Sequence, residues 1–207
     1  LGDRLVDAWP RRKARWLLAA LALHRRGLTP WVAAEVLEDP QLVAKNGNLL
    51  RVNVGALRRA LEPGLERGED SRWVEFHDGG YRLAPDAAIE VDVWAFEGLL
   101  EQADACRRAD PAGAEGLYAQ AVALVRADLL DKAGARERFV AEREQLRARA
   151  LGALAFLAQR AEAARDLVAA GAHHGQAALL APADSDVALA GLAFHARAGQ
   201  PELALDS

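Results

Sequence analysis

The chain has 207 residues, of which 52% are hydrophobic and 27% charged, so it can bury a core and lacks the composition of a disordered protein. Its net charge of -4 gives no whole-chain signal for nucleic acid or an acidic membrane, and its single cysteine excludes an intrachain disulfide and multi-cysteine metal sites. The longest apolar run, Trp16 to Leu23, is far shorter than the ~20 residues that cross a bilayer. We therefore expect a cytoplasmic protein. Because the sequence begins at Leu1 and contains no methionine, we expect a piece of a longer gene product.

Three helices are predicted in the first half of the chain. An apolar stripe within Arg11–Arg26 predicts the first. The second runs from Pro30 to about Glu38, with Thr29 as its N-cap, Pro30 at the favoured first position and Pro40 ending it. The third covers 48–61, because apolar side chains recur there at helical spacing, at Leu50, Val54, Leu57 and Leu61.

A β-hairpin is predicted after these helices. Residues 73–77 alternate weakly, Asp78-Gly79-Gly80 forms a turn, and the chain returns through 81–83. Residues 4–6 have the composition of another strand, whose partner is expected before Leu1.

The second half is predicted to be all helical, since alanine, the strongest helix former, becomes much more frequent from Ala95 onward. Breaks at Asp110-Pro111, Gly134, Pro182 and Gly199 delimit helices at about 93–108, 113–129, 136–165, 167–181 and 186–199. Paired helices of this length are typical of a helical-repeat array. A further helix starts near Gly199 and is expected to be truncated at Ser207.

Three helices followed by a hairpin is the order of a winged helix. The segment Leu50-Arg51-Val52-Asn53-Val54-Gly55-Ala56-Leu57-Arg58-Arg59-Ala60-Leu61 resembles the recognition helix of OmpR-type DNA-binding domains, and Gly79-Gly80-Tyr81-Arg82-Leu83 resembles their wing. The second half opens with Val91-Asp92-Val93-Trp94-Ala95-Phe96. Together these segments resemble the SARP/AfsR type of bacterial regulator over nearly the whole chain.

This resemblance implies a mainly α fold in two domains. Residues 1–90 are expected to form an OmpR-like winged helix-turn-helix with a β-hairpin wing and incomplete N-terminal strands. Residues 91–207 are expected to form a bacterial transcriptional activator domain, an all-α tetratricopeptide-like (TPR) repeat domain truncated at its C-terminal end. The implied function is transcription regulation: the winged helix reads double-stranded promoter DNA, and the repeats contact RNA polymerase, a second copy or a sensor. Related regulators bind as dimers or in tandem, so a homodimer is among the implied assemblies.

The predicted recognition helix is poor in base-reading side chains. With its leucines facing the core, a helical wheel turns Asn48, Val52, Gly55, Ala56 and Arg59 outward and places Arg51 and Arg58 on one flank. Asn48 could read adenine and Arg59 guanine, while Val52 and Ala56 could contact thymine methyl groups. Glu75 and Asp78 flank His77 in the wing, where acids oppose binding to phosphate.

Each basic feature also has a structural interpretation. The run Arg11, Arg12, Lys13, Arg15 either faces phosphate or is a solvated helix start. Residues 45–48 either hold phosphate or form an ordinary turn and N-cap. The arginines of the third helix either contact DNA or form intrahelical pairs, such as Arg58 with Glu62. The candidate DNA-contacting residues are Arg11, Arg12, Lys13, Lys45, Asn48, Arg51, Val52, Asn53, Ala56, Arg58, Arg59, His77, Tyr81 and Arg82.

No catalytic chemistry is predicted. The few hydroxyls and the thiol of Cys106 lie outside any nucleophile motif, neither a phosphate-binding loop nor a dinucleotide fingerprint occurs, and adjacent His173 and His174 point about 100° apart on a helix. We therefore expect no enzyme activity, no metal and no cofactor. The alternative to a DNA-binding regulator is a protein-interaction or effector-binding module of the same ancestry with lost or weak DNA readout.

Overall fold

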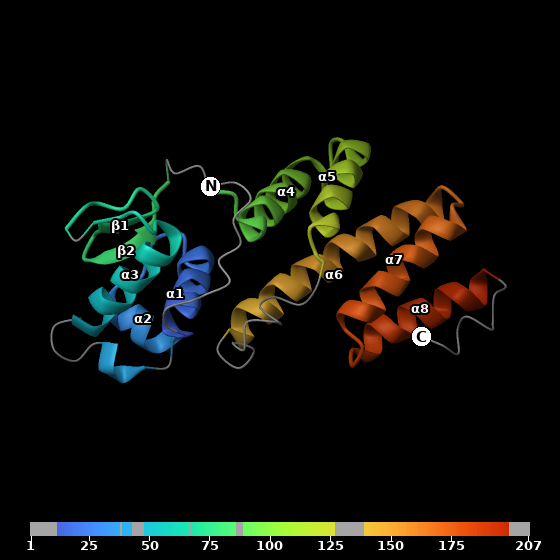
Figure 1. Ribbon diagram of the computed structural model, residues 1–207. Coiled ribbons are helices and arrows are strands. Elements are labelled where there is room, and N and C mark those ends of the chain that lie inside the picture. Colours follow the sequence, from blue (N-terminus) through green and yellow to red (C-terminus); the bar gives the residue numbers. More distant parts are fainter. Residues whose placement is uncertain are drawn as a thin grey trace. The chain divides into compact units, whose positions relative to one another are not determined.

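The computed structural model describes residues 12–37, 39–42, 48–66, 68–85, 89–126 and 139–198, apart from the side chains of Arg12 and Leu42. Within these ranges the chain is mainly helical, with eight α-helices, one short 3-10 helix and a two-stranded antiparallel sheet (Figure 1). None of these helices is long and apolar enough to cross a membrane. The strand predicted at 4–6 and the helix predicted after Gly199 lie outside the described residues.

The described residues form two compact units. The first contains the residues up to Val93 together with Phe139 and Val140, and the second contains 94–126 and 141–198. The division falls close to the boundary expected at 90/91, but Phe139, which is fully buried, belongs to the first unit although it lies far along the chain.

The first unit begins with two helices, α1 (Arg12–Leu23) and α2 (Pro30–Val36). The buried face of α1 and the N-cap of α2 are their clearest features. The buried face of α1 follows helical spacing and consists of Ala14, Trp16, Leu17, Ala20 and Leu21. The hydroxyl of Thr29 accepts a hydrogen bond from the backbone N–H of Val32, which confirms the predicted N-cap, with Pro30 in the first turn. The second helix ends two residues earlier than predicted, and Pro40 begins the 3-10 helix η1 (Pro40–Leu42).

Helix α3 (Asn48–Leu61) has the bounds that the sequence predicted. Leu50, Val54 and Leu57 are buried, and α3 packs against α1 and η1. Its leucine stripe is therefore covered by other elements of the first unit, which fixes the rotation of α3 about its axis.

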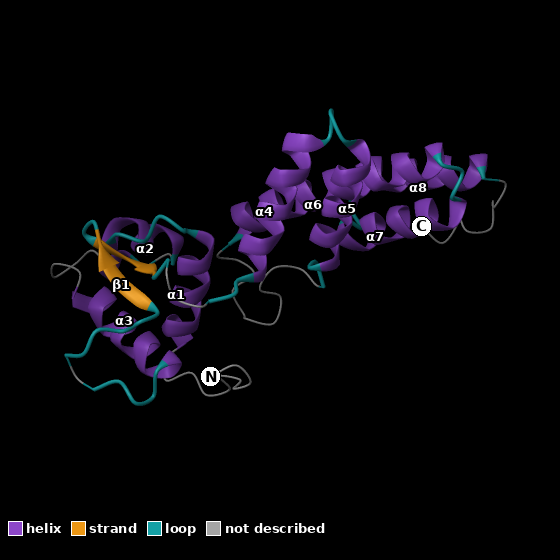
Figure 2. Ribbon diagram, turned by 90° about the horizontal axis from the view of Figure 1, so that it is seen from above, coloured by secondary structure: helices purple, strands orange, loops and turns teal. Residues whose placement is uncertain are grey.

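The hairpin consists of β1 (Val74–His77) and β2 (Gly80–Leu83), with Val74 opposite Leu83 and His77 opposite Gly80. Its turn has two residues, Asp78 and Gly79, both with positive φ (48° and 77°), rather than the three expected. A single bridge joins Leu28 to Tyr81, so the hairpin is hydrogen-bonded to the segment between α1 and α2. Figure 2 shows the two strands, in orange, beside α1 and α3.

The second unit is all helical in its described part, with α4 (Asp92–Cys106), α5 (Pro111–Ala123), α6 (Val140–Ala163), α7 (Leu167–Leu180) and α8 (Ser185–Arg197). The main core is shared by α4, α5 and α6, with Phe96, Leu100, Tyr118, Leu154 and Leu157 among its large side chains. A smaller cluster joins α6, α7 and α8 through Ala161, Ala170 and Phe194. Alanine makes up half of the buried residues of the main core and two of the three in the smaller cluster.

Aspartate N-caps set the starts of three of these helices. Asp110, Asp166 and Asp184 each accept a hydrogen bond from backbone N–H groups in the first turn of α5, α7 and α8. Helix α5 was predicted at 113–129 and instead covers 111–123, because Asp110 caps it and Pro111 occupies its first position.

Candidate nucleic-acid interface

Helix α3 exposes a stripe that contains basic and neutral residues but no acid. Asn48, Val52 and Arg59 are exposed and Gly55 is partly exposed, and their spacing of four, three and four residues places them on one face. Arg51 is exposed beside this stripe. Since α3 contains no Asp or Glu, neither Arg51 nor Arg59 has an acidic neighbour within the helix itself.

The guanidinium of Arg59 lies back along this face. Its Nη1 atom is 3.7 Å from the position that a Cβ would occupy on Gly55. The missing side chain at Gly55 therefore leaves space that an extended or a folded Arg59 can use.

Two predicted contact residues are buried instead of outward-facing. Asn53 and Ala56 are each 1% exposed, and the Asn53 amide donates a 3.0 Å hydrogen bond to the carbonyl oxygen of Leu49 one turn earlier. The placement of Ala56 on the outer face was wrong, because α3 is covered by both α1 and η1 and its buried arc is wider than the leucine stripe. Neither residue can reach a base edge in this conformation.

Arg58 is hydrogen-bonded to the hairpin. Its Nε and Nη2 atoms donate hydrogen bonds of 3.1 and 2.7 Å to the carbonyl oxygen of Val74, and its guanidinium carbon lies 5.9 Å from the centre of the Tyr81 ring. The intrahelical pair with Glu62 is not formed, because Glu62 accepts hydrogen bonds from the Ser71 hydroxyl and the Arg72 backbone. Arg58 therefore holds α3 and β1 together rather than facing outward.

Of the basic residues at the start of α1, one is paired within the first unit and another is exposed. The ammonium group of Lys13 pairs with the carboxylate of Asp39, a buried residue between α2 and η1, so Lys13 ties two segments of the first unit together. Arg15 is exposed. Arg12 begins α1, but its side chain is not described, and Arg11 and Lys45 lie outside the described residues.

The two acids of the hairpin are paired. Arg82 Nε donates to Glu75 Oε1 across the strands, and His77 Nε2 lies 3.0 Å from Asp78 Oδ2, a contact that becomes an ion pair when the imidazole is protonated. Glu75 therefore adds little net repulsion toward phosphate. Arg82, which was predicted as a DNA contact, is therefore engaged in an ion pair within the hairpin.

The sequence analysis did not single out two exposed aromatic side chains. Phe76 on β1 is 60% exposed and packs edge-on against Tyr81, with ring centroids 5.2 Å apart, while Trp31 on α2 is 73% exposed. Strand alternation places Phe76 on the same face of the hairpin as the buried Val74. It is exposed because it lies near the tip of the hairpin, next to the turn.

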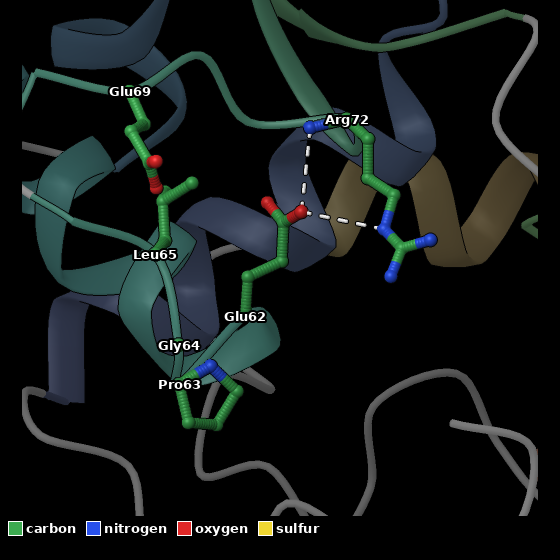
Figure 3. Close-up of a pocket in the computed structure, with 6 residues that line it drawn as sticks. All are labelled: Glu62, Pro63, Gly64, Leu65, Glu69 and Arg72. Atoms are coloured by element: carbon green, nitrogen blue, oxygen red, sulfur yellow. Dashed lines mark hydrogen bonds and ion pairs between the residues drawn. The ribbon is translucent and has the colours of Figure 1, made fainter.

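A hollow of about 300 Å³ lies beyond the C-terminal end of α3. Figure 3 shows that Glu62 and Arg72 face each other there, and that the other lining residues are Pro63, Gly64, Leu65 and Glu69. The Arg72 guanidinium is already paired with Glu62, with Nε 3.5 Å from Oε1. The hollow is open and acidic on balance, so it is unsuited to phosphate.

In the part of the chain that the structure describes, no three His, Cys, Asp or Glu side chains gather where they could hold a metal ion. Comparison with protein-family models, with curated proteins and with solved structures found no match.

Proposed function

We propose that the chain is a DNA-binding transcriptional regulator whose first unit is an OmpR-like winged helix. In this proposal α2 and α3 form the helix-turn-helix, α3 enters the major groove and the hairpin is the wing. The order of the elements supports this assignment, as does the bridge between Leu28 and Tyr81, which joins the hairpin to the segment before α2.

The observation that carries the proposal is the exposed stripe of α3. Four residues of α3 lie on its solvent-facing side, while other parts of the helix pack against α1 and η1, and α3 itself contains no acid. These residues are Asn48, Arg51, Val52 and Arg59. Arginine and asparagine side chains read guanine and adenine in the major groove, and valine can contact a thymine methyl group. A helix with this face fits a groove lined by phosphates better than it fits an apolar partner.

The second unit acts in this proposal as a TPR-like bacterial transcriptional activator domain that contacts RNA polymerase, a second copy or a sensor. Its array of antiparallel helices with alanine-rich contacts supports a repeat architecture. The proposed site of action is the bacterial cytoplasm, where promoter DNA and polymerase are found.

Binding of the full chain to a pool of random-sequence duplexes tests the proposal. Fluorescence anisotropy at several salt concentrations gives the salt slope, and sequencing of the retained duplexes gives the preferred site. We expect an enriched repeat and a steep slope. Changing both Arg51 and Arg59 to Gln should lower the magnitude of that slope by about 2, since each positive charge removed from among the phosphates of the groove accounts for about 0.9.

Arg108 and Arg126 provide the matched control, because both are exposed arginines of the second unit. Changing both to Gln removes the same net charge and should leave the affinity and the slope unchanged. Equal losses in the two double variants would show that binding follows net charge alone and would refute the assignment of α3.

A second candidate function is an interaction module of the same ancestry with weak DNA readout. The observation that favours it is that Lys13, Arg58 and Arg82, three of the predicted contacts, are engaged within the first unit. A shallow salt slope with no enriched sequence would support this second function over the first.

A further inference from the structure

Phe76 is the most exposed apolar side chain of the hairpin, and it lies on the side of the hairpin that faces α3. Strand register places Phe76 directly opposite Tyr81, so both rings are on one face, with centroids 5.2 Å apart. This face is turned toward α3, because the Arg58 guanidinium lies over the Tyr81 ring. The Phe76 ring is nevertheless 60% exposed.

The first strand of the hairpin runs along α3 toward the N-terminal half of that helix. Near the C-terminal end of α3, Glu62 accepts a hydrogen bond from the Ser71 hydroxyl, just before the hairpin. One turn earlier on α3, Arg58 donates to the carbonyl oxygen of Val74, three residues further along the chain. Because helix and strand run in opposite directions through these contacts, Phe76 lies further toward the half of α3 that carries most of its exposed stripe.

The strand that supports the Phe76 ring is fixed to the rest of the first unit. The backbone N–H of Leu28 donates to the carbonyl oxygen of Tyr81 at 2.7 Å, and the N–H of Tyr81 donates back to Leu28 at 2.9 Å. The turn has only two residues, Asp78 and Gly79, so no long loop extends past the ring. A partner therefore meets an apolar group that is already positioned, at little cost in conformational entropy.

The charged side chains of the hairpin are occupied with one another. Arg82 is paired with Glu75 across the strands, and His77 Nε2 lies 3.0 Å from Asp78 Oδ2. The Asp78 side chain is 87% exposed at the turn, where phosphates would repel it. The hairpin therefore gains little from phosphate contacts. Its exposed ring is suited instead to the base edges and stacked bases at the floor of the minor groove, which apolar side chains enter.

We propose that Phe76 is an apolar wedge, which enters the minor groove beside the major groove that α3 occupies and separates two stacked base pairs. Phenylalanine inserted between base pairs in this way unstacks them and kinks the duplex. The wedge should favour a pyrimidine–purine step, TA or CA/TG, because these steps unstack most easily. This proposal rests on the proposed function of α3 and adds a second source of sequence preference, one that reads deformability.

The selection from random-sequence duplexes separates the two sources. With the unmodified chain, we expect the retained duplexes to carry a TA or CA/TG step at a fixed distance from the bases selected by α3. With Phe76→Gln, the α3 bases should be retained and the step lost. Enriched α3 bases without such a step would overturn the wedge and leave the proposed function intact. No enriched sequence together with a shallow salt slope would overturn both.

A 2-aminopurine base placed in the selected step measures unstacking directly, since its fluorescence rises when stacking is lost. Binding of the unmodified chain should produce this rise, and Phe76→Gln should abolish it. The affinity of Phe76→Gln should fall about tenfold, the order expected for one lost base–aromatic contact. Its salt slope should stay the same, because no charge is removed. No rise with the unmodified chain, or an equal rise with Phe76→Gln, would show that the ring has another role.

Phe76→Leu should restore most of the rise, since leucine also acts as an apolar wedge. Trp31→Gln is the matched control, because Trp31 is an exposed aromatic residue of the same unit, on α2 rather than on the hairpin. It should leave the step preference and the fluorescence rise unchanged. Both Gln variants should keep the urea midpoint of the unmodified chain, as their rings are exposed. Equal losses in the two Gln variants would contradict the wedge at Phe76.

Discussion

The guanidinium of Arg58 donates two hydrogen bonds to the carbonyl oxygen of Val74, and so joins α3 to the first residue of the hairpin. Val74 is fully buried and Tyr81 of the second strand lies beside the same guanidinium. One arginine of α3 therefore positions the hairpin, while Arg51 and Arg59 remain on the exposed face. This division separates the arginine that stabilises the unit from the two arginines that we propose as DNA contacts.

Replacing Arg58 with alanine should destabilise the first unit by about 1.5–3 kcal/mol, because the buried carbonyl of Val74 loses charge-assisted hydrogen bonds. Urea denaturation followed by tryptophan fluorescence measures the change. Arg59→Ala removes an exposed side chain from the same helix and should change the stability by less than about 0.5 kcal/mol. Equal effects at the two positions would contradict the structural role of Arg58.

Replacing Gly80 with alanine should also destabilise the first unit. A Cβ at this position would lie 2.5 Å from the carbonyl oxygen of Leu28, so the hairpin must move away from the segment before α2. We expect a loss of about 1–3 kcal/mol, the usual cost of overpacking. Gly64→Ala is the control, since its added methyl group meets nothing within 4 Å. Thermal unfolding should separate the two variants clearly, and a stable Gly80→Ala chain would show that the bridge to Tyr81 is dispensable.

Arg165 ends α6 in a left-handed conformation with φ of 61°, and the backbone N–H of Asp166 reaches back to the carbonyl oxygen of Ala161. Glycine adopts this conformation without the steric cost that a Cβ imposes. Arg165→Gly should therefore stabilise the second unit by about 1 kcal/mol. Arg165→Ala retains the Cβ and should give no gain. The comparison requires only the unfolding midpoints of the three chains in urea.

His173 should make the second unit less stable in mild acid. Burial lowers the pKa of His173 below its ordinary value of 6.5, and the neighbouring His174 lowers it further, against the opposing charges of Glu115 and Asp166. The unfolded chain then takes up a proton more readily than the folded one, so stability is full above pH 6.5 and falls as the pH drops through that value.

The urea midpoint should therefore decrease between about pH 7.5 and pH 5.5. His173→Gln should show a smaller decrease than the unmodified chain. An identical pH dependence in the two chains would remove His173 as the source of the effect.

The sequence by itself determined the elements whose cause is local. The bounds of α3 follow from leucines at helical spacing, the start of α2 follows from Thr29 and Pro30, and the hairpin follows from Asp78-Gly79 between two short strands. These features depend on side chains within a few residues of the backbone groups that they satisfy, so a reading of the neighbouring sequence is sufficient. The mainly helical character of the chain was predicted for the same reason.

Only the tertiary structure decided which basic side chains are exposed and which are engaged by other residues of the chain. Lys13 and Asp39 are distant in the sequence, as are Arg58 and Val74. No pattern in the sequence around Lys13 or around Arg58 indicates its partner. Ala56 is buried because α1 and η1 together cover more of α3 than a leucine stripe requires. The exposure of Val168 and Leu179 on α7 is likewise a tertiary property: an apolar side chain favours burial, but among the described residues α6 and α8 pack against the face of α7 that carries Ala170. Long-range contacts are set by how elements pack in space, which local periodicity does not encode.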